Sequence, residues 1–209
     1  PISFAMSYIW LAKMIAGMGT YAIATYDVVK NLERFAFVPA MAFAQIITFL
    51  VSNRLGSNDP DGASANIKKV LFMSMGAVGM CLFVMCWKAT YFVSFFDPRG
   101  SFTAFAATVL PLISMFVVFD LIQVILAGAL RGAGDVRSVM WTRFGVSIVV
   151  FGPAAYLVNL LPISNMIIKF SLLYSTYYLS TGAMAFFFLD RKSTRLNSSH
   201  TDISRMPSS

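Results

Sequence analysis

Long apolar runs separated by short polar breaks make up residues 1–189 of the chain. A helix needs about 20 mainly apolar residues to cross the hydrocarbon core of a bilayer, and most of the runs reach or approach this length. The first run is shorter, and we interpret it as the end of a helix whose beginning is missing. The pattern predicts six membrane helices, at about residues 2–16, 35–51, 70–87, 102–130, 140–161 and 166–189.

The polar breaks carry residues that start and stop helices. Gly56 is placed to cap the end of the second helix, and Asp59-Pro60 supplies an N-cap followed by a proline at the first helical position. Residues 97–100, Asp-Pro-Arg-Gly, predict a turn, and Asp135 predicts another N-cap. Gly152-Pro153 lies inside the fifth run and predicts a kink there.

The composition indicates a membrane protein. The chain is 58% hydrophobic and 12% charged, with a mean hydropathy of +0.73. Soluble domains are about 45–50% apolar and about 25% charged. So few polar residues could not cover such an apolar core in water, and lipid is the solvent that accepts it. The sequence therefore predicts an all-α integral membrane protein that crosses the cell membrane several times.

The net charge of +7 does not indicate a nucleic-acid-binding protein. Basic residues fall mainly in the breaks between apolar runs, and no basic stripe is interleaved with stacking aromatic residues. Membrane topology explains the charge better, because Lys and Arg in short loops set the orientation of the helices. We expect contact with the lipid bilayer and none with nucleic acid.

The composition changes at Asp190, where a polar, Ser-rich segment without periodicity begins. Such a segment is typical of a disordered cytoplasmic tail. Residues 192–200 also resemble the translation of a common sequencing-library adapter, and residues 204–209 resemble the same adapter in another frame. We interpret residues 190–209 as a disordered artefact and leave them out of the fold prediction. Since Pro1 is not an initiator either, we expect a gene truncated at both ends.

Asp120 is the main candidate for chemistry, because it alone among the seven acids before residue 190 lies deep in an apolar run. A carboxylate in hydrocarbon is costly, so a functional role is favoured over a structural hydrogen bond. Gln123 lies one helical turn away and either shares that function or bonds a neighbouring helix. For Glu33 a structural pair with Arg34 is favoured, and for Gln45 a polar contact between helices.

Metal and catalytic sites lack the residues they need. Cys81 and Cys86 are five residues apart, which turns their side chains about 140° apart on a helix. The one histidine, His200, lies in the excluded tail. Asp120 is solitary, so the sequence offers no His–Asp, paired-acid or Ser–His arrangement of a membrane enzyme. We expect no enzymatic activity and no bound metal or cofactor.

Two stretches resemble the C-terminal lobe of the multidrug and toxic compound extrusion (MATE) family. One runs from Leu32 to Pro60. The other runs from Asp120 to Arg137 and is more specific, with an acid, a Gln three residues later and a Gly-x-x-Arg-Gly-x-Gly-Asp-x-Arg motif. A weaker resemblance extends over nearly all of residues 1–189.

The resemblance implies one six-helix lobe of a twelve-helix transporter with pseudo-twofold symmetry. Residues 1–189 would be the C-terminal lobe, helices seven to twelve, with helix seven truncated and the N-terminal lobe of the same chain missing. It also implies a secondary active antiporter in a bacterial inner membrane. Such an antiporter exports cationic amphipathic drugs or toxic compounds in exchange for protons or sodium ions. The fragment alone should not transport.

Site residues follow from the same resemblance. An ion-coupling and substrate cavity is implied at Asp120, Gln123, Phe116, Gln45 and Glu33. A cytoplasmic hinge loop is implied at Arg131, Gly132, Gly134, Asp135 and Arg137, so the loops containing Arg54 and Arg131 are placed in the cytoplasm. The best-known family members carry an acid on helix seven and a Tyr at the position of Phe116, whereas residues 2–16 contain no carboxylate. The choice between H⁺ and Na⁺ therefore stays open.

Two other functions compete with drug export. A lipid-linked oligosaccharide flippase of the same broad superfamily would need several cationic residues inside its spans to hold pyrophosphate, and only Lys13 and Lys88 approach this. A purely structural scaffold subunit would have no need of a buried acid such as Asp120. Export of small organic cations is the favoured function.

Overall fold

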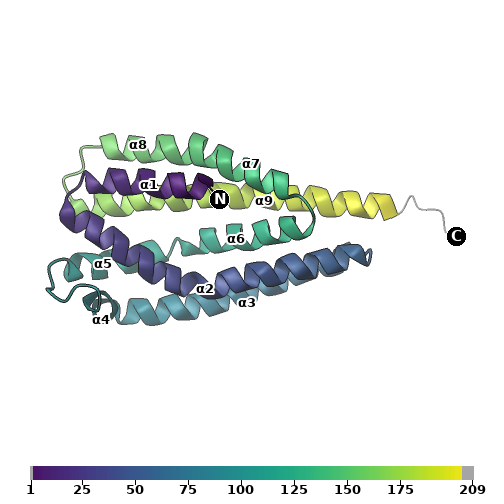
Figure 1. The fold of residues 1–209 in the computed structure, drawn as a ribbon, viewed down its shortest axis with the longest axis horizontal. Coiled ribbons are helices and arrows are strands. Elements are labelled where there is room, and N and C mark those ends of the chain that lie inside the picture. Colours follow the sequence, from purple (N-terminus) through teal and green to yellow (C-terminus); the bar gives the residue numbers. More distant parts are fainter. Residues whose placement is uncertain (1, 204–209) are drawn as a thin grey trace.

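The computed structural model describes residues 2–203 as an elongated bundle of helices (Figure 1). The described residues contain no strand. The long helices run back and forth along one direction, so the connecting loops gather at two opposite ends of the bundle (Figure 1). In chain order the elements are α1 (Ile2–Ala16), α2 (Thr20–Gly56), α3 (Pro60–Trp87), α4 (Ala89–Ser94), α5 (Thr103–Ser114), α6 (Val117–Gly132), α7 (Val136–Val146), the π-helical segment η1 (Ser147–Phe151), α8 (Gly152–Leu160) and α9 (Met166–Ile203).

Among the described residues, four helical segments are each long and apolar enough to cross a membrane. They are α2, α3, the stretch Val136–Leu160 that joins α7, η1 and α8, and α9 up to Thr194. A fifth span is formed if α5 and α6, which are bent by 50° at their junction, are taken together. Helix α1 has 15 residues and the same bounds as the first predicted run. The predicted all-α membrane fold is confirmed.

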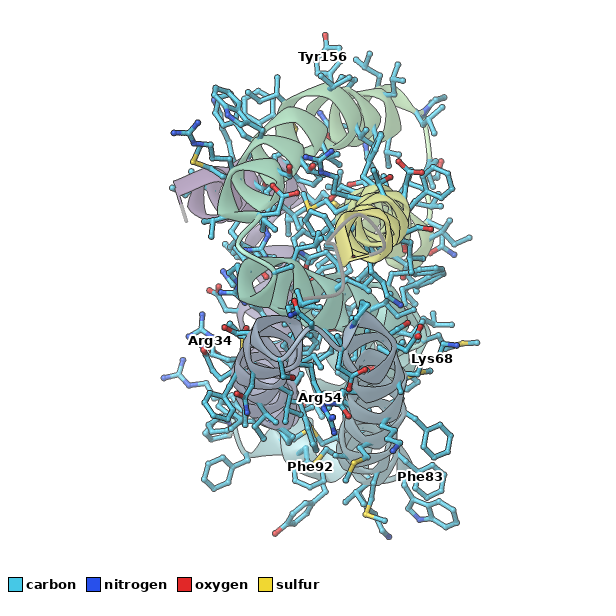
Figure 2. The ribbon with its side chains drawn as sticks, turned by 90° about the vertical axis from the view of Figure 1, so that its right-hand side faces the viewer. Arg34, Arg54, Lys68, Phe83, Phe92 and Tyr156 are labelled. Carbon is cyan, nitrogen blue, oxygen red and sulfur yellow. The ribbon has the colours of Figure 1, made fainter. Side chains whose placement is uncertain are left out.

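Large apolar side chains cover much of the outside of the bundle. Phe83 on α3 is 62% exposed and Tyr156 on α8 is 53% exposed, and the two point outward from opposite edges (Figure 2). Many other large apolar side chains are exposed as well, and so much apolar surface is rare on soluble monomers. Lipid tails are the surroundings that suit it.

Helix α2 is longer than the apolar run that predicted it. The mixed sequence 20–34 is helical as well, so α2 has 37 residues. Pro39 lies inside this helix, and α2 is visibly bent along its length (Figure 1). A proline in a helix interior removes one backbone hydrogen bond and clashes with the preceding turn, which explains a bend here.

Helices α2 and α6 pack with their backbones in close contact. A methyl group added at Gly128 on α6 would lie 2.6 Å from the backbone oxygen of Ala44 on α2, and one at Gly132 would collide with the backbone oxygen of Thr48. The hydroxyl of Thr48 donates to the carbonyl of Gly128 at 2.9 Å. Two small residues four positions apart allow such an approach in membranes, where packing and polar contacts hold helices together.

The fourth predicted span is broken in two. Helix α5 ends at Ser114 and α6 begins at Val117, with Pro111 inside the last turns of α5. The proline cannot donate to the carbonyl of Ala107 one turn earlier, so the end of α5 is weakened just before the break. The break places Asp120 in the first turn of α6.

The fifth predicted span is irregular slightly before the predicted kink. The chain is π-helical over Ser147–Phe151 and returns to an α-helix at Gly152. Because Pro153 lacks the N–H that would bond the carbonyl of Val149, the irregularity falls in the turn that precedes it.

The loops at the two ends confirm the predicted cap at Asp59 and the predicted turn at residues 97–100. Asp135 holds the N-cap position of α7, as predicted, but its side chain makes no capping hydrogen bond. Asp59 caps α3 by accepting a 2.8 Å hydrogen bond from the backbone N–H of Gly62. Asp97 accepts hydrogen bonds from Ser101, Phe102 and Thr103, which closes the predicted turn. The prediction for Gly56 was wrong: it is the last residue of α2, and the left-handed residue that turns the chain is Asn58, at φ 56°.

Helix α9 extends beyond the predicted span. It continues to Ile203, so residues 190–203 are helical where disorder was expected. Extending an existing helix avoids the unfavourable nucleation step, which lets polar residues follow an apolar span without a break. Arg191 donates to Asp135 at 2.8 Å and ties this end of α9 to the start of α7. Residues 204–209 of the predicted tail lie outside the described residues.

Candidate functional site

A cavity of about 540 Å³ lies between α1, α2, α6, α7 and α9. Val38 and Met41, both 59% exposed, belong to its wall, so the cavity is open on one side of the bundle. Its polar and charged lining consists of Tyr8, Lys30, Glu33, Arg34, Gln45, Asp120, Arg131, Arg143, Tyr174, Tyr177 and Tyr178. A cavity of this size whose wall combines apolar and polar groups suits a small amphipathic molecule.

Glu33 is held by two tyrosines from the far side of the bundle. The hydroxyl of Tyr174 donates to one carboxylate oxygen at 2.6 Å, and the hydroxyl of Tyr178 donates to the other at 2.8 Å. The two tyrosines are four residues apart on α9, so they lie one above the other on one face. The predicted structural pair of Glu33 with Arg34 was wrong, because the carboxylate turns inward to these hydroxyls while Arg34 is exposed.

Aromatic contacts fix the remaining tyrosines. The hydroxyls of Tyr8 and Tyr177 are 2.8 Å apart, and their rings stack with centroids 5.1 Å apart. Phe116, at the break before α6, stacks on Tyr178 with centroids 6.4 Å apart. Phe116 therefore contacts a residue that binds Glu33, although it does not itself line the cavity.

Asp120 enters the cavity from the first turn of α6. The N-terminal end of a helix favours negative charge, because its first backbone N–H groups have no partners within the helix. Arg143 on α7 lines the same cavity and interacts electrostatically with Asp120, and so does Glu33. The structure thus brings two carboxyl groups from α2 and α6 to one cavity.

The other two predicted polar residues, Gln45 and Gln123, differ in whether they line the cavity. Gln45 lines the cavity but is exposed there rather than packed between helices. Gln123 is fully buried and does not line the cavity, and its amide has no hydrogen-bond partner among the described residues. The cavity-facing positions of α6 next to Asp120 are Val117 and Val124, so Gln123 points into the packed side of the helix.

The predicted hinge residues have several structural roles. Arg131 donates to the carbonyl of Ala127 on its own helix at 3.2 Å and lines the cavity. Gly132 packs on α2, and Gly134, at φ 78°, turns the chain into α7. Asp135 pairs with Arg191, and Arg137 is exposed. Whether this loop moves stays a prediction.

Six polar or charged residues of the cavity wall were not singled out by the sequence analysis: Tyr8, Lys30, Arg143, Tyr174, Tyr177 and Tyr178. The spacing of the last three, at positions i, i+3 and i+4 in an apolar run, places them on one helix face and was an available signal. Lys30 and Arg143 fell under the general interpretation of Lys and Arg as residues that set the membrane orientation. Nothing near them in the sequence shows that they face a cavity.

The fold and the cavity are those of a multi-pass membrane protein with a partly polar cavity among its helices. The MatE family model matches residues 2–157, and the chain belongs to this family of transporters. It is 24% identical over 146 residues to the probable multidrug resistance protein NorM of Mannheimia succiniciproducens, which covers 70% of this chain and 31% of that protein. It is 28% identical over 152 residues to the protein of the same name from Pasteurella multocida. That match covers 69% of this chain and 31% of the relative.

A solved structure shows the same fold. The chain superposes on a crystal structure of a MATE protein in the bent conformation with a TM-score of 0.84 at 10% sequence identity. The match covers 96% of this chain and 44% of that one. The chain therefore spans less than half of the solved relative and about a third of the NorM proteins.

Proposed function

We propose that this chain is the C-terminal lobe of a secondary active antiporter that exports cationic amphipathic drugs or toxic compounds in exchange for protons or sodium ions. The observation that carries the proposal is the presence of Glu33 and Asp120 in one cavity within membrane-spanning helices. Carboxyl groups in a membrane are costly and mark ion or substrate pathways.

Exchange requires that the driving ion and the substrate compete. A carboxylate in a poorly hydrated cavity needs a compensating positive charge, which a proton, a sodium ion or an organic cation can supply. Binding of one then lowers the affinity for the other, and this reciprocal coupling drives export. Phe37, Val38 and Met41 offer apolar surface for the body of the substrate.

The open side of the cavity is where the N-terminal lobe of the same protein would close it. We place the chain as a multi-pass protein of a bacterial inner membrane, with the loops of Arg54 and Arg131 in the cytoplasm. The names of the relatives favour drug export over transport of lipid-linked oligosaccharides.

Competition can be measured on the chain itself. Ethidium, a fluorescent organic cation, is titrated onto the chain in lipid nanodiscs at several pH values and sodium concentrations. The affinity for ethidium should fall as protons or sodium ions increase. Glu33→Gln and Asp120→Asn should together remove this dependence. The proposal would be contradicted if the affinity for ethidium did not change with pH or sodium concentration. It would also be contradicted if that change persisted in the double variant.

A further inference from the structure

Lys30 places its charge over aromatic rings, and the carboxylate of Asp27, one turn earlier on α2, acts on it only electrostatically, without an ion pair. Its ammonium nitrogen lies 4.2 Å from the ring centroid of Tyr8 and 5.2 Å from that of Tyr26. Neither Arg54–Asp59 nor Arg191–Asp135, the ion pairs found between described residues, involves Lys30. Lys30 and Tyr8 line the cavity, whereas Tyr26 does not and its ring lies behind Lys30.

The two rings are rigidly held. Tyr8 is fixed by the hydroxyl contact and the ring stack with Tyr177. Tyr26 is 1% exposed, packs against the ring of Tyr174 at 5.9 Å and donates to the backbone oxygen of Tyr8 at 3.4 Å. A pair of rings held in this way is prepared for a cation before it arrives, so binding costs little reorganisation.

Lys30, in contrast, sits on a flexible stem and is only half-buried. The carboxylate one turn further along α2, that of Glu33, accepts its hydrogen bonds from Tyr174 and Tyr178. The ammonium group of Lys30 is therefore held mainly by the rings, and an incoming cation with a stronger preference for aromatic faces can replace it. Quaternary ammonium groups have that preference, since they donate no hydrogen bonds and are weakly hydrated.

We propose that Tyr8 and Tyr26 form an aromatic subsite for the ammonium group of the exported compound, and that Lys30 is a tethered cation that occupies this subsite until the compound displaces it. The inference rests on the proposed function and adds to it the position of the substrate charge and a built-in competitor. Binding of every organic cation is weakened by the cost of moving Lys30 away. Return of Lys30 to the rings then favours release.

The test compares two charge removals from the same cavity wall. Tetrapropylammonium is titrated onto the chain in nanodiscs with Lys30→Gln and with Arg34→Gln. Arg34 also lines the cavity on α2, but it points outward (Figure 2) and acts on Tyr8 only through its charge. Removing Lys30 should tighten binding roughly 2- to 30-fold, the range of one cation–π contact. Removing Arg34 should change it much less, and Lys30→Arg should leave it near the parental value.

A second measurement follows Lys30 directly. In chain labelled with ¹³C-lysine, the ε-methylene signal that disappears in Lys30→Gln should be shifted upfield by the two rings. Tetrapropylammonium should return it toward the position of an exposed lysine. Equal tightening by Arg34→Gln would show a general charge effect and overturn the inference. A Lys30 signal that does not move while tetrapropylammonium binds would also overturn the inference, but it would leave the proposed function intact. If the probe binds none of the variants, the proposed function itself is in error.

Discussion

Tyr174 on α9 donates a 2.6 Å hydrogen bond to Glu33 on α2, joining positions 141 residues apart. With the matching bond from Tyr178, it fixes both oxygens of the carboxylate in the middle of the bundle. The last helix thereby sets the geometry of a charged residue near the start of the chain.

We expect Tyr174→Phe to destabilise the chain by about 1.5–3 kcal/mol, the usual value for a hydrogen bond to a charged group. Thermal unfolding in detergent measures this. Tyr156→Phe is the matched control, because Tyr156 points away from the bundle and should change the melting temperature little (Figure 2). In the background of Glu33→Gln the effect of Tyr174→Phe should shrink. An undiminished effect there would mean that Tyr174 stabilises the bundle through its ring contacts instead.

The contact of α2 with α6 is predicted to tolerate no side chain at Gly128. Gly128→Ala places a methyl group 2.6 Å from the carbonyl oxygen of Ala44, so the helices must separate and the bond from Thr48 must lengthen. We expect a loss of about 1–3 kcal/mol, typical of overpacking. Gly76→Ala on α3 meets no atom within 4 Å and should lose nothing. Equal melting temperatures for the two variants would contradict this packing.

Asp97, in the loop between α4 and α5, should make that loop sensitive to acid. Burial alone would raise its pKa, but the hydrogen bonds from Phe102, Thr103 and Ser101 outweigh burial and lower the pKa to about 2. The ordinary value is about 3.9. Because the folded pKa is the lower one, the stabilisation is fully present above about pH 4 and disappears as the pH falls through 2.

Hydrogen exchange of the Phe102 and Thr103 amides reports on this loop. After correction for intrinsic exchange rates, their protection should decrease between pH 4 and pH 2 in the parent. Asp97→Asn, which cannot carry the charge, should show reduced protection at neutral pH and no further decrease in acid. Protection that stays constant down to pH 2 in the parent would rule out this role for Asp97.

The orientation in the membrane is tested with single cysteines after Cys81 and Cys86 are replaced by serine. Ser57 and Val136 are exposed at one end of the bundle, and Arg99 is exposed at the other. We expect cysteines at Ser57 and Val136 to react with an impermeant maleimide only from the cytoplasm, and one at Arg99 only from outside. Labelling of all three from one side would refute the topology.

The sequence predicted where the chain crosses the membrane but little of what lies inside the bundle. Length, apolar composition and polar breaks are enough to locate spans. Local chemistry alone marks Asp59 as a cap and Asp97 as part of a turn. The direction that a residue faces is harder to predict, because both sides of a membrane helix can be apolar. Gln123, one turn from Asp120, was therefore expected to share its surroundings, yet it faces the packed side of α6.

The partners of Glu33 could not be predicted from the sequence either. Its partners, Tyr174 and Tyr178, come from the last helix, and no local pattern links them to α2. Its sequence neighbour Arg34 offered a simpler pairing, which the tertiary structure overrides. The bend at residues 115–116 was also hidden, since Pro111 inside an apolar run is compatible with a straight span as well as with a broken one.

The role of Asp120 is decided in a full-length transporter rebuilt by supplying a matching N-terminal lobe. Asp120→Asn keeps the volume and hydrogen-bonding capacity of the side chain but removes the group that can exchange one cation for another. The variant should insert and fold, yet lose efflux of a cationic dye from vesicles under an imposed proton or sodium gradient. Dye binding should also lose its dependence on the driving ion, because coupling between two ligands requires the group they share. Asp120→Glu, one methylene longer, should keep part of the activity. If Asp120→Asn pumps at the parental rate under both gradients, Asp120 is structural, and the coupling carboxyl group of this lobe must be sought at Glu33.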